Sequence, residues 1–441
     1  LSRGLGDVYK RQRQEAHNYL DLALHYAKAG LLEEAVEILQ ACPEQSPMPS
    51  YYEGYLHGLA GDEAAARACC LRAEHLPAPR CYPNRVEEIA ILEYAIRLLG
   101  RAPRAHALLG CLLYDKKQAD AAIAHWEASV QQDPGQALVH RNLAIARYNK
   151  QGDADAALRE MEQARRLDPG YPRLLLEYDQ LAARLGRSNA ARLQLLEENL
   201  ALVEQRDDLM LRYVTLLNCE GRCEEALQIL LTRRFHPWEG GEGKVSAQYR
   251  YALIRLAKDC LNRGENDRAV QLLEQSKTYP DTLGEGKLPN VPDNEADYWQ
   301  GVALRAMGRE PEAAAAFLRA ASGPQEPGRV LYYNDQPSDF IYYQGLAQRA
   351  MGNEAAARKA FHKLLTYGET HLFDAVAYDF FAVSLPEIEV FADDIALRNR
   401  QYCNYLRALG CAGLGRTSEA AELFAGILEL QPDDQGALRH A

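Results

Sequence analysis

Most of the chain consists of stretches in which apolar residues recur every three or four positions, separated by short turns that contain glycine. This spacing places the apolar side chains on one face of a helix, so each stretch predicts an amphipathic helix. No stretch alternates β-branched and polar residues as a half-buried strand does. Glycine favours the left-handed backbone in which many helices end. Ten glycines occupy such junctions: Gly30, Gly61, Gly100, Gly152, Gly186, Gly221, Gly264, Gly308, Gly352 and Gly415. The basic unit is therefore an antiparallel helix pair.

The clearest helix pair spans residues 105–134. The small residues Gly110 and Ala122 allow its two helices to approach closely, and Trp126 fills the space between them. Pro134 ends the second helix. These offsets resemble those of a tetratricopeptide repeat. Four further stretches keep comparable offsets: Leu143 to Pro169, Gly301 to Ala320, Gly345 to Phe361, and Gly415 to Pro432.

Unrelated helices would not keep a common phase over five stretches, so the pattern predicts a repeat array. The helices expected near 14–41, 50–74, 172–203, 207–232 and 247–276 fit the pattern more loosely. We therefore predict an all-α fold, a tetratricopeptide-type α-solenoid of about ten to eleven antiparallel helix pairs. The alternative is a compact all-helical domain without superhelical order.

The repeats lengthen after Gly221, where the spacing between turn glycines rises from 34 and 35 residues to 43 and 44. The added residues form three loops at equivalent positions: 235–245, 279–294 and 322–339. Insertions at equivalent positions of a solenoid emerge on one face, which is often the binding face. Two of the loops carry the tetrapeptide Gly-Glu-Gly-Lys, at 241–244 and 284–287, and the third has Arg329 nearby.

The tetrapeptide is not a nucleotide-binding P-loop. That motif needs an earlier glycine, where the first copy has Trp238, and a Ser or Thr after the lysine, where Val245 and Leu288 stand. Two interpretations remain open. The turns cap helix ends and pair internally between neighbouring repeats, or they present Glu, Lys and aromatic groups to a ligand.

The three loops also supply the candidate ligand contacts. The third loop places two tyrosines beside an amide and a carboxylate, a combination that can stack on and hydrogen-bond a sugar. His236 lies beside Trp238 and either faces a ligand or packs within the loop against a backbone group. The candidate contacts with a ligand or partner are His236, Trp238, Glu239, Glu242, Lys244, Glu285, Lys287, Arg329, Tyr332, Tyr333, Asn334 and Asp335.

Composition narrows the classes of function. The net charge of −12 argues against a nucleic-acid surface, which needs basic patches. No run approaches the roughly 18 apolar residues of a membrane helix, so we expect no membrane partner. The ten cysteines contain no Cys-x-x-Cys and mostly lie among Leu and Ala, which predicts buried thiols and a cytoplasmic setting. Tyrosines at helical spacing, such as Tyr51, Tyr52 and Tyr55, are expected to fill the packing between repeats. We expect no metal site, no cofactor and no catalytic residues.

The first twelve residues, LSRGLGDVYKRQ, lack the hydrophobic pattern, and Asp7 to Gln12 resembles a translated sequencing adapter. We therefore expect 1–12 to be a foreign, disordered leader and the native N-terminus, with any signal peptide, to be missing. We divide the rest into regular repeats over 13–234 and repeats with long loops over 235–441. An extra helical insert is expected near 371–395, where apolar residues recur at helical spacing.

The string from Phe235 to Ser246, FHPWEGGEGKVS, resembles a signature in the C-terminal tetratricopeptide arrays of large bacterial proteins. Those proteins carry an upstream β-sandwich domain of unknown function that is similar to sugar mutarotases. The resemblance extends over roughly residues 14–441. It implies a role beside carbohydrate metabolism, and it supplies no catalytic residues for this chain.

Two functions follow from these observations. The first is a non-catalytic scaffold for interactions between proteins or domains, whose most strongly implied partner is the upstream domain of the same polypeptide. The second is the repeat portion of a carbohydrate-active enzyme. In that case loops 235–245, 279–294 and 322–339 would complete a glycan site together with the missing upstream domain.

Overall fold

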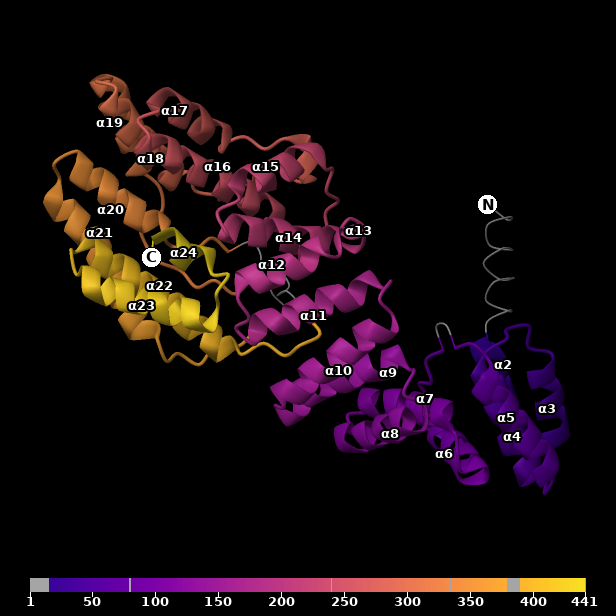
Figure 1. Cartoon of the computed structure of the whole chain (residues 1–441). Coiled ribbons are helices and arrows are strands. Elements are labelled where there is room, and N and C mark those ends of the chain that lie inside the picture. Colours follow the sequence, from indigo (N-terminus) through magenta and orange to yellow (C-terminus); the bar gives the residue numbers. More distant parts are fainter. Residues whose placement is uncertain (1–15, 79–80, 239, 333–334, 379–388, 441) are drawn as a thin grey trace, which may run out of the picture. The chain divides into compact units, whose positions relative to one another are not determined.

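The structure, a computed structural model, describes residues 16–78, 81–238, 240–332, 335–378 and 389–440. Every regular element within these ranges is a helix, which confirms the all-α fold class (Figure 1). The chain divides into two compact units, residues 1–169 and 170–441. The boundary between these units, after residue 169, differs from the boundary at residue 235 that the lengths of the loops suggest. Each unit is described separately below.

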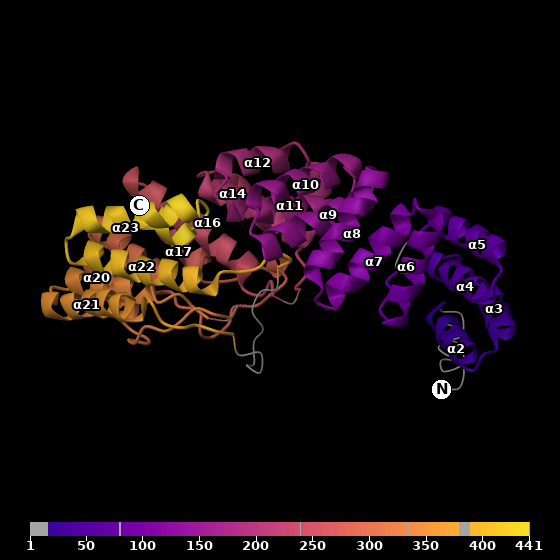
Figure 2. The same cartoon turned by 90° about the horizontal axis from the view of Figure 1, so that it is seen from below.

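Unit 1, residues 1–169, contains four helix pairs and one single helix among its described residues. They are α2 (Ala16–Lys28) with α3 (Leu32–Gln40), α4 (Pro47–Leu59) with α5 (Glu63–His75), the single α6 (Glu87–Leu99), α7 (Pro103–Asp115) with α8 (Ala119–Gln132), and α9 (Ala137–Ala146) with α10 (Ala154–Leu167). Figure 2 shows these helices side by side in chain order. A continuous apolar core runs from Leu20 to Ala146.

Unit 2, residues 170–441, contains six helix pairs among its described residues. They are α11 (Pro172–Arg184) with α12 (Asn189–Glu197), α14 (Asp207–Cys219) with α15 (Cys223–Thr232), α16 (Lys244–Asn262) with α17 (Asn266–Gln275), α18 (Asn294–Ala306) with α19 (Glu310–Ala320), α20 (Phe340–Ala350) with α21 (Glu354–His371), and α22 (Ile395–Gly413) with α23 (Thr417–Leu430). The short α13 (Leu200–Val203) follows α12, and α24 (Gln435–His440) follows α23. The ten pairs in the described part of the chain agree with the predicted ten to eleven.

The predicted contact between a small residue and a large ring recurs inside the pairs. A Cβ atom on Gly110 would lie 2.5 Å from the Trp126 ring, and one on Gly301 would lie 2.6 Å from the Phe317 ring. In both pairs the glycine precedes the ring by 16 residues along the chain. Because a side chain on either glycine would collide with the ring, this offset fixes how closely the two helices approach.

The ten turn glycines all adopt positive φ angles, as the sequence predicts. The turn between α7 and α8, which lies between Gly100 and Gly152, contains no such glycine. Lys117 occupies that turn with φ 64°, and among the described residues it is the one non-glycine residue with positive φ. Lys117 therefore stands where the other pairs have a glycine, and it adopts the same backbone conformation.

The pair α9–α10 departs from the 16-residue offset because Met161 follows the small residue Ala144 by 17 positions. A π-helix over Arg147–Gln151 continues α9 and absorbs the extra residue. Ala144 and Met161 are both fully buried, so the packing of this pair is preserved despite the insertion.

The long loops lie where the spacing predicts, between the second helix of one pair and the first helix of the next. The expected extra helix near 371–395 is not seen in its described part. α21 ends at His371, and residues 373–378 have no regular structure. Phe373, one of the apolar residues whose spacing suggests that helix, is 84% exposed. Residues 379–388 of the expected helix lie outside the described residues.

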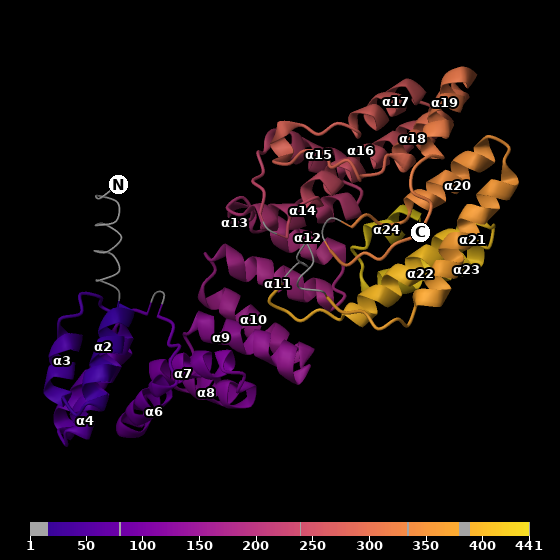
Figure 3. The same ribbon diagram turned by 180° about the vertical axis from the view of Figure 1, so that it is seen from behind.

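The last described residues of the chain, which include α24, contact helices from earlier in unit 2. Asn189 of α12 donates a hydrogen bond from Nδ2 to the Pro432 carbonyl at 2.6 Å. The side-chain amides of Gln248, on α16, and Gln435, on α24, hydrogen-bond each other at 2.8–2.9 Å. In Figures 1 and 3, α24 accordingly lies among the helices of unit 2, close to α12 and α22.

Candidate functional site

The first two long loops of unit 2 pack directly against each other. The Phe235 amide donates to the Thr282 carbonyl at 2.8 Å, and the Thr282 hydroxyl donates to the Leu230 carbonyl at 2.8 Å. Gly284 has a φ of +76°, and a Cβ there would lie 2.4 Å from the Phe235 carbonyl oxygen. The glycine of the second Gly-Glu-Gly-Lys copy is therefore required both by its backbone angle and by the close contact.

The glutamate of that second copy caps a helix of the preceding repeat. The Glu285 carboxylate accepts hydrogen bonds from the backbone amides of Gly243, at 2.7 Å, and Ser246, at 3.1 Å. These amides belong to the N-terminal end of α16, where the helix dipole attracts an anion. A phosphate bound by a glycine-rich loop would use the same donors, and here the protein's own carboxylate occupies them.

Two basic residues of the loops are paired with carboxylates of the protein itself. Lys287 Nζ donates to both carboxylate oxygens of Asp293, at 2.6 and 2.5 Å, and to the Lys277 carbonyl at 3.3 Å. Arg329 forms an ion pair with Asp374. These contacts favour the interpretation that the turns pair internally between neighbouring repeats.

The first loop is attached to α14 through Asp207. Its carboxylate accepts hydrogen bonds from Arg233 at 2.6 Å, and from the backbone amide and ring Nδ1 of His236 at 2.9 and 3.0 Å. Burial opposes the charge of Asp207, but the hydrogen bonds from Arg233 and His236 outweigh burial and hold its pKa below the usual value. His236 thus has a structural partner while most of its side chain stays exposed.

The aromatic residue of the first loop is packed rather than presented. Trp238 lies against the apolar core of unit 2, and a Cβ on Gly241 would lie 2.1 Å from its ring. The Glu242 carboxylate stays local and accepts a hydrogen bond from the Gly240 amide at 2.7 Å. Lys244 forms the first residue of α16.

The third loop reaches the same place as the other two. A cleft of about 60 Å³ is lined by Ser246, Arg250, Tyr279, Glu285 and Leu288, together with Gln336 of the third loop. The three loops therefore gather on one face of unit 2. The cleft is small beside the roughly 300–1,000 Å³ of typical ligand pockets, and this volume holds only a few water molecules.

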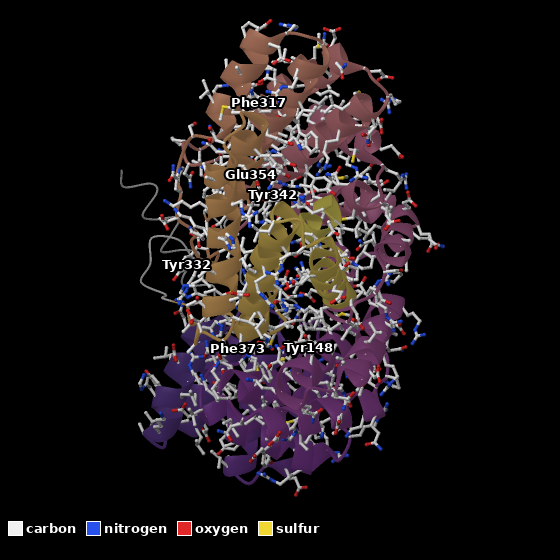
Figure 4. All side chains as sticks on the ribbon, turned by 90° about the vertical axis from the view of Figure 1, so that its left-hand side faces the viewer. Tyr148, Phe317, Tyr332, Tyr342, Glu354 and Phe373 are labelled. Atoms are coloured by element: carbon white, nitrogen blue, oxygen red, sulfur yellow. The ribbon has the colours of Figure 1, made fainter. Side chains whose placement is uncertain are left out.

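The proposed sugar-binding run of the third loop is only partly described. Asp335 accepts hydrogen bonds from the backbone amides of Leu331, at 2.8 Å, and Tyr332, at 2.9 Å. Tyr332 lies at the periphery of unit 2, whereas Tyr342 lies among its helices (Figure 4). The candidates Glu239, Tyr333 and Asn334 lie outside the described residues. A ligand-binding role for the loop residues stays a prediction.

Unit 1 contains a larger opening that the sequence did not single out. An apolar cavity of about 250 Å³ lies between α2, α4 and α6. It is lined by Ala23, Leu24, Ala27, Tyr52, Tyr55, Leu56, Leu59, Ala90 and Ile91, with Lys28 and Glu87 at its edge. Leu59 is 56% exposed there. The available sequence signal was the Leu and Ala residues of α2, α4 and α6, and single apolar residues at the surface are too common to indicate a site.

Polar contacts hold the walls of this cavity in place. The Tyr52 hydroxyl donates to the buried Glu88 carboxylate at 2.9 Å, and the Tyr55 ring packs edge-on against Tyr94 at 5.6 Å. Lys28 and Glu87 form an exposed ion pair at 2.8 Å. Such surface pairs contribute little to stability, so this one can separate when a partner approaches.

Other chemistry is scarce in the described part of the chain. No group of three or more His, Cys, Asp or Glu side chains there could hold a metal ion. No helix among these residues is long and apolar enough to cross a membrane. Most of the ten cysteines are buried, as predicted, and all are free. Burial raises the pKa of Cys70, Cys81 and Cys223 to about 12 each, so these thiols stay protonated and unreactive at neutral pH.

Comparison with known proteins bears on this architecture. Residues 339–367, which cover α20 and most of α21, match the tetratricopeptide repeat family. Among solved structures, residues 41 to the end of MamA from Desulfovibrio magneticus RS-1 are 19% identical with a TM-score of 0.25, covering 43% of this chain and 93% of that chain. YrrB, a TPR protein with an unusual peptide-binding site, is 14% identical with a TM-score of 0.32, covering 51% and 96%.

A tetratricopeptide repeat protein from Parabacteroides merdae ATCC 43184 is 16% identical with a TM-score of 0.29, covering 69% of this chain and 100% of that chain. The match at residues 339–367 and the repeated helix-pair packing together identify the repeat type.

Proposed function

We propose that this chain is a non-catalytic scaffold that binds another protein, or another domain of its own polypeptide, through its array of helix pairs. The tetratricopeptide repeat match and the succession of helix pairs support a protein-interaction scaffold. Arrays of this kind bury their core between neighbouring pairs and leave an extended face free for a partner.

The apolar cavity of unit 1 is the observation that carries the proposal. An apolar side chain of a partner that enters it would remove Leu59 and Ala90 from water, which is favourable in proportion to the apolar area covered. The charged groups of Lys28 and Glu87 at the edge can then bind polar groups of the partner. A cavity of about 250 Å³ accommodates one or two side chains rather than a whole sugar chain.

The first partner to test is the upstream mutarotase-like domain that the resemblance of residues 235–246 implies. Calorimetry between this chain and the separately expressed domain should show saturable binding. Ala90→Arg places a long cation at the mouth of the cavity and should weaken binding by about tenfold or more, a loss of ~1.4 kcal/mol. Ala68→Arg, at an exposed position of α5 that does not line the cavity, should leave binding unchanged.

Equal affinities for the two arginine variants would contradict the role of the cavity. A glycan that binds the chain alone, and whose binding is lost with Trp238→Ala, would instead assign the chain to a carbohydrate-active enzyme. Trp238 packs on the core of unit 2, so thermal melting must show that this variant remains folded.

A further inference from the structure

Two histidine rings meet between the helices of the pair α7–α8. The Nδ1 atom of His106, on α7, lies 2.9 Å from the Nδ1 atom of His125, on α8. The ring centroids are 5.1 Å apart, and the ring planes are inclined by 39°. Both residues are partly exposed, so solvent reaches the histidine pair. Because the two residues are 19 positions apart and come from different helices, no local spacing motif indicates them, and the sequence alone predicts no metal site.

The backbone on both sides of the histidine pair is fixed by contacts that do not involve the imidazoles. Directly beside the pair, the Trp126 ring donates from Nε1 to the Ala107 carbonyl at 3.2 Å. About one turn further along, the Ser129 hydroxyl donates to the Pro103 carbonyl at 2.7 Å. These contacts hold the two helices in place whatever the histidine rings bind. A site whose supports are separate from its ligands is preorganised.

Both histidine rings are neutral at physiological pH. Burial lowers the pKa of both rings, and the nearby His125 lowers the pKa of His106 further. Glu93, on α6, is the charged group that acts on the pair, and its carboxylate partly offsets the effect of burial on the pKa of His125. The same negative charge favours a cation beside the rings. A neutral imidazole has one protonated nitrogen and one lone pair.

The lone pairs of the two Nδ1 atoms can be made available together. In the described part of the chain, the contact between the two Nδ1 atoms is the one hydrogen bond that either ring forms. Both Nε2 atoms can therefore carry the ring protons. Each Nδ1 atom then presents a lone pair, which is the group that a histidine uses to bind a metal ion.

The distance between the two nitrogens selects a class of ion. With metal–nitrogen bonds of about 2.05 Å, two nitrogens that bind at a right angle are about 2.9 Å apart, and two at the tetrahedral angle are about 3.3 Å apart. The observed 2.9 Å matches the right angle. Ni²⁺ and Cu²⁺ take nitrogen ligands at right angles, and imidazole suits both ions. Tetrahedral Zn²⁺ would need the two rings to move apart.

We propose that His106 and His125 bind a divalent transition-metal ion of the Ni²⁺ and Cu²⁺ class through both Nδ1 atoms. Water fills the other coordination positions, because no group of three or more His, Cys, Asp or Glu side chains forms among the described residues. Without an ion, the two rings share one proton in a hydrogen bond. On binding, this proton moves through water to Nε2 of the same ring, so the neutral pair releases no proton.

The ion connects α7 to α8 and makes the stability of this helix pair depend on the concentration of the metal. The proposal goes beyond the scaffold function and does not depend on the cavity of unit 1.

The test is a calorimetric titration of the full chain, freed of metals with a chelator, with Ni²⁺ at pH 7.5. The tightest site should bind one ion. His106→Gln or His125→Gln should weaken binding at least tenfold, because glutamine supplies no imidazole lone pair. His75→Gln is the matched control, because His75 is an exposed histidine at the end of α5 in the same unit. This control should keep the affinity of the unaltered chain, and equal affinities for all four proteins would overturn the proposal.

Stability gives a second readout. An excess of Ni²⁺ should raise the melting temperature of the unaltered chain and slow the amide exchange of α7 and α8, because an ion that binds only the folded state stabilises it. Neither effect should appear in His125→Gln. If exchange in these two helices does not respond to Ni²⁺ in the unaltered chain, the two rings form a hydrogen bond and nothing more, and the proposal is wrong.

A third measurement needs no variant of the histidine pair and therefore holds even if such a variant fails to fold. Electron paramagnetic resonance of the unaltered chain with less than one equivalent of Cu²⁺ should show coupling to two imidazole nitrogens. His75→Gln should give the same spectrum. Coupling to one imidazole nitrogen or to none would contradict binding by the pair.

Discussion

The Phe361 side chain determines how closely three helices of unit 2 approach one another. Its ring is fully buried between Gly345 of α20 and Gly413 of α22. A Cβ on Gly345 would lie 2.5 Å from the ring, and one on Gly413 would lie 2.1 Å from it. The Arg349 guanidinium lies 4.9 Å from the ring centroid and covers it further. Because protein interiors are close-packed, this ring has no room to move away from an added methyl group.

We therefore expect Gly345→Ala to destabilise unit 2 by about 1–3 kcal/mol, the usual cost of an overpacked core. The measurement is the shift of the urea midpoint of unfolding. Gly426→Ala is the matched control, because Gly426 is exposed within α23 and an added Cβ would have no atom within 4 Å. That change should stabilise by about 0.5–1 kcal/mol, since alanine favours the helix. Destabilisation of equal size by both changes would contradict the packing argument.

At the scale of single residues, the sequence predicts the packing role of a residue where the same residue type recurs at a fixed spacing along the chain. Gly110 before Trp126 and Gly301 before Phe317 are visible because the 16-residue spacing repeats. Lys117 is not predictable in this way, because a lysine is not an expected residue at positive φ. The role of Lys117 becomes clear only from the structure, where it forms the turn between α7 and α8.

The long loops act as structural connections between successive pairs. Glu285 reaches back to the first turn of α16. Thr282 hydrogen-bonds the backbone of Leu230, near the end of α15, and of Phe235, the first residue of the first loop. The second loop therefore stabilises the repeat before it. The first two loops lie together because the second is anchored to the first, and this face need not bind a ligand to be retained.

Glu285→Ala should consequently lower the stability of unit 2. The change removes two charge-assisted hydrogen bonds to the amides of Gly243 and Ser246, and losing a helix cap of this kind costs about 1–2 kcal/mol. Thermal melting measures the loss, and Glu285→Gln, which keeps one acceptor oxygen, should fall between the two. Glu312→Ala, which breaks only an exposed pair with Arg309, should melt almost as the unaltered chain does. An unchanged melting temperature for Glu285→Ala would favour a ligand role for the loop.

The sequence predicts the position of these loops but not their contacts. The two Gly-Glu-Gly-Lys copies are identical, yet Glu242 bonds within its own turn while Glu285 bonds a helix 39–42 residues earlier. A local pattern cannot distinguish the two cases, because the difference depends on which helix end lies within reach. The insert expected near 371–395 shows the same limit, since the helical spacing around Phe373 is not accompanied by a helix at residues 373–378.

At the scale of the whole molecule, the described part of unit 2 closes on itself. Arg184 of α11 pairs with Glu389 at 2.6 Å, and Arg192 of α12 pairs with Asp433 at 2.9 Å. These partners are 205 and 241 residues apart in the sequence. The repeat period predicts the stacking of helix pairs, whereas closure depends on small rotations between pairs that accumulate along the array. The residues that meet are polar and follow no period, so these contacts could not be predicted from the sequence.

The segment of residues 432–440, which contacts the helices of unit 2, holds a titratable ring whose charged form is disfavoured. Burial, followed by the positive charges of Arg439 and Lys258, holds the pKa of His440 well below its usual value. The other titratable groups facing this end of the segment are Glu295, Asp339, Tyr342, Tyr343 and Tyr405. Burial raises the pKa of all three tyrosines, so they remain neutral in the physiological range. It also raises the pKa of Asp339 and of Asp434 in the segment itself.

Docking of residues 432–440 should therefore weaken as the pH falls below about 6.5, the ordinary pKa of histidine. The free segment binds a proton on His440 that the docked segment excludes, so acid favours the free form, by at most about 1.4 kcal/mol between pH 7.5 and 5.5. Asp339 and Asp434 act in the opposite direction, because their raised pKa values favour protonation in the docked state. The measurement is accordingly a difference: hydrogen exchange of residues 435–440 in the unaltered chain against His440→Phe, which keeps a flat ring beside Phe424 and does not titrate. The unaltered chain should lose more protection on acidification than the variant, and equal losses would show that His440 is not the group that responds.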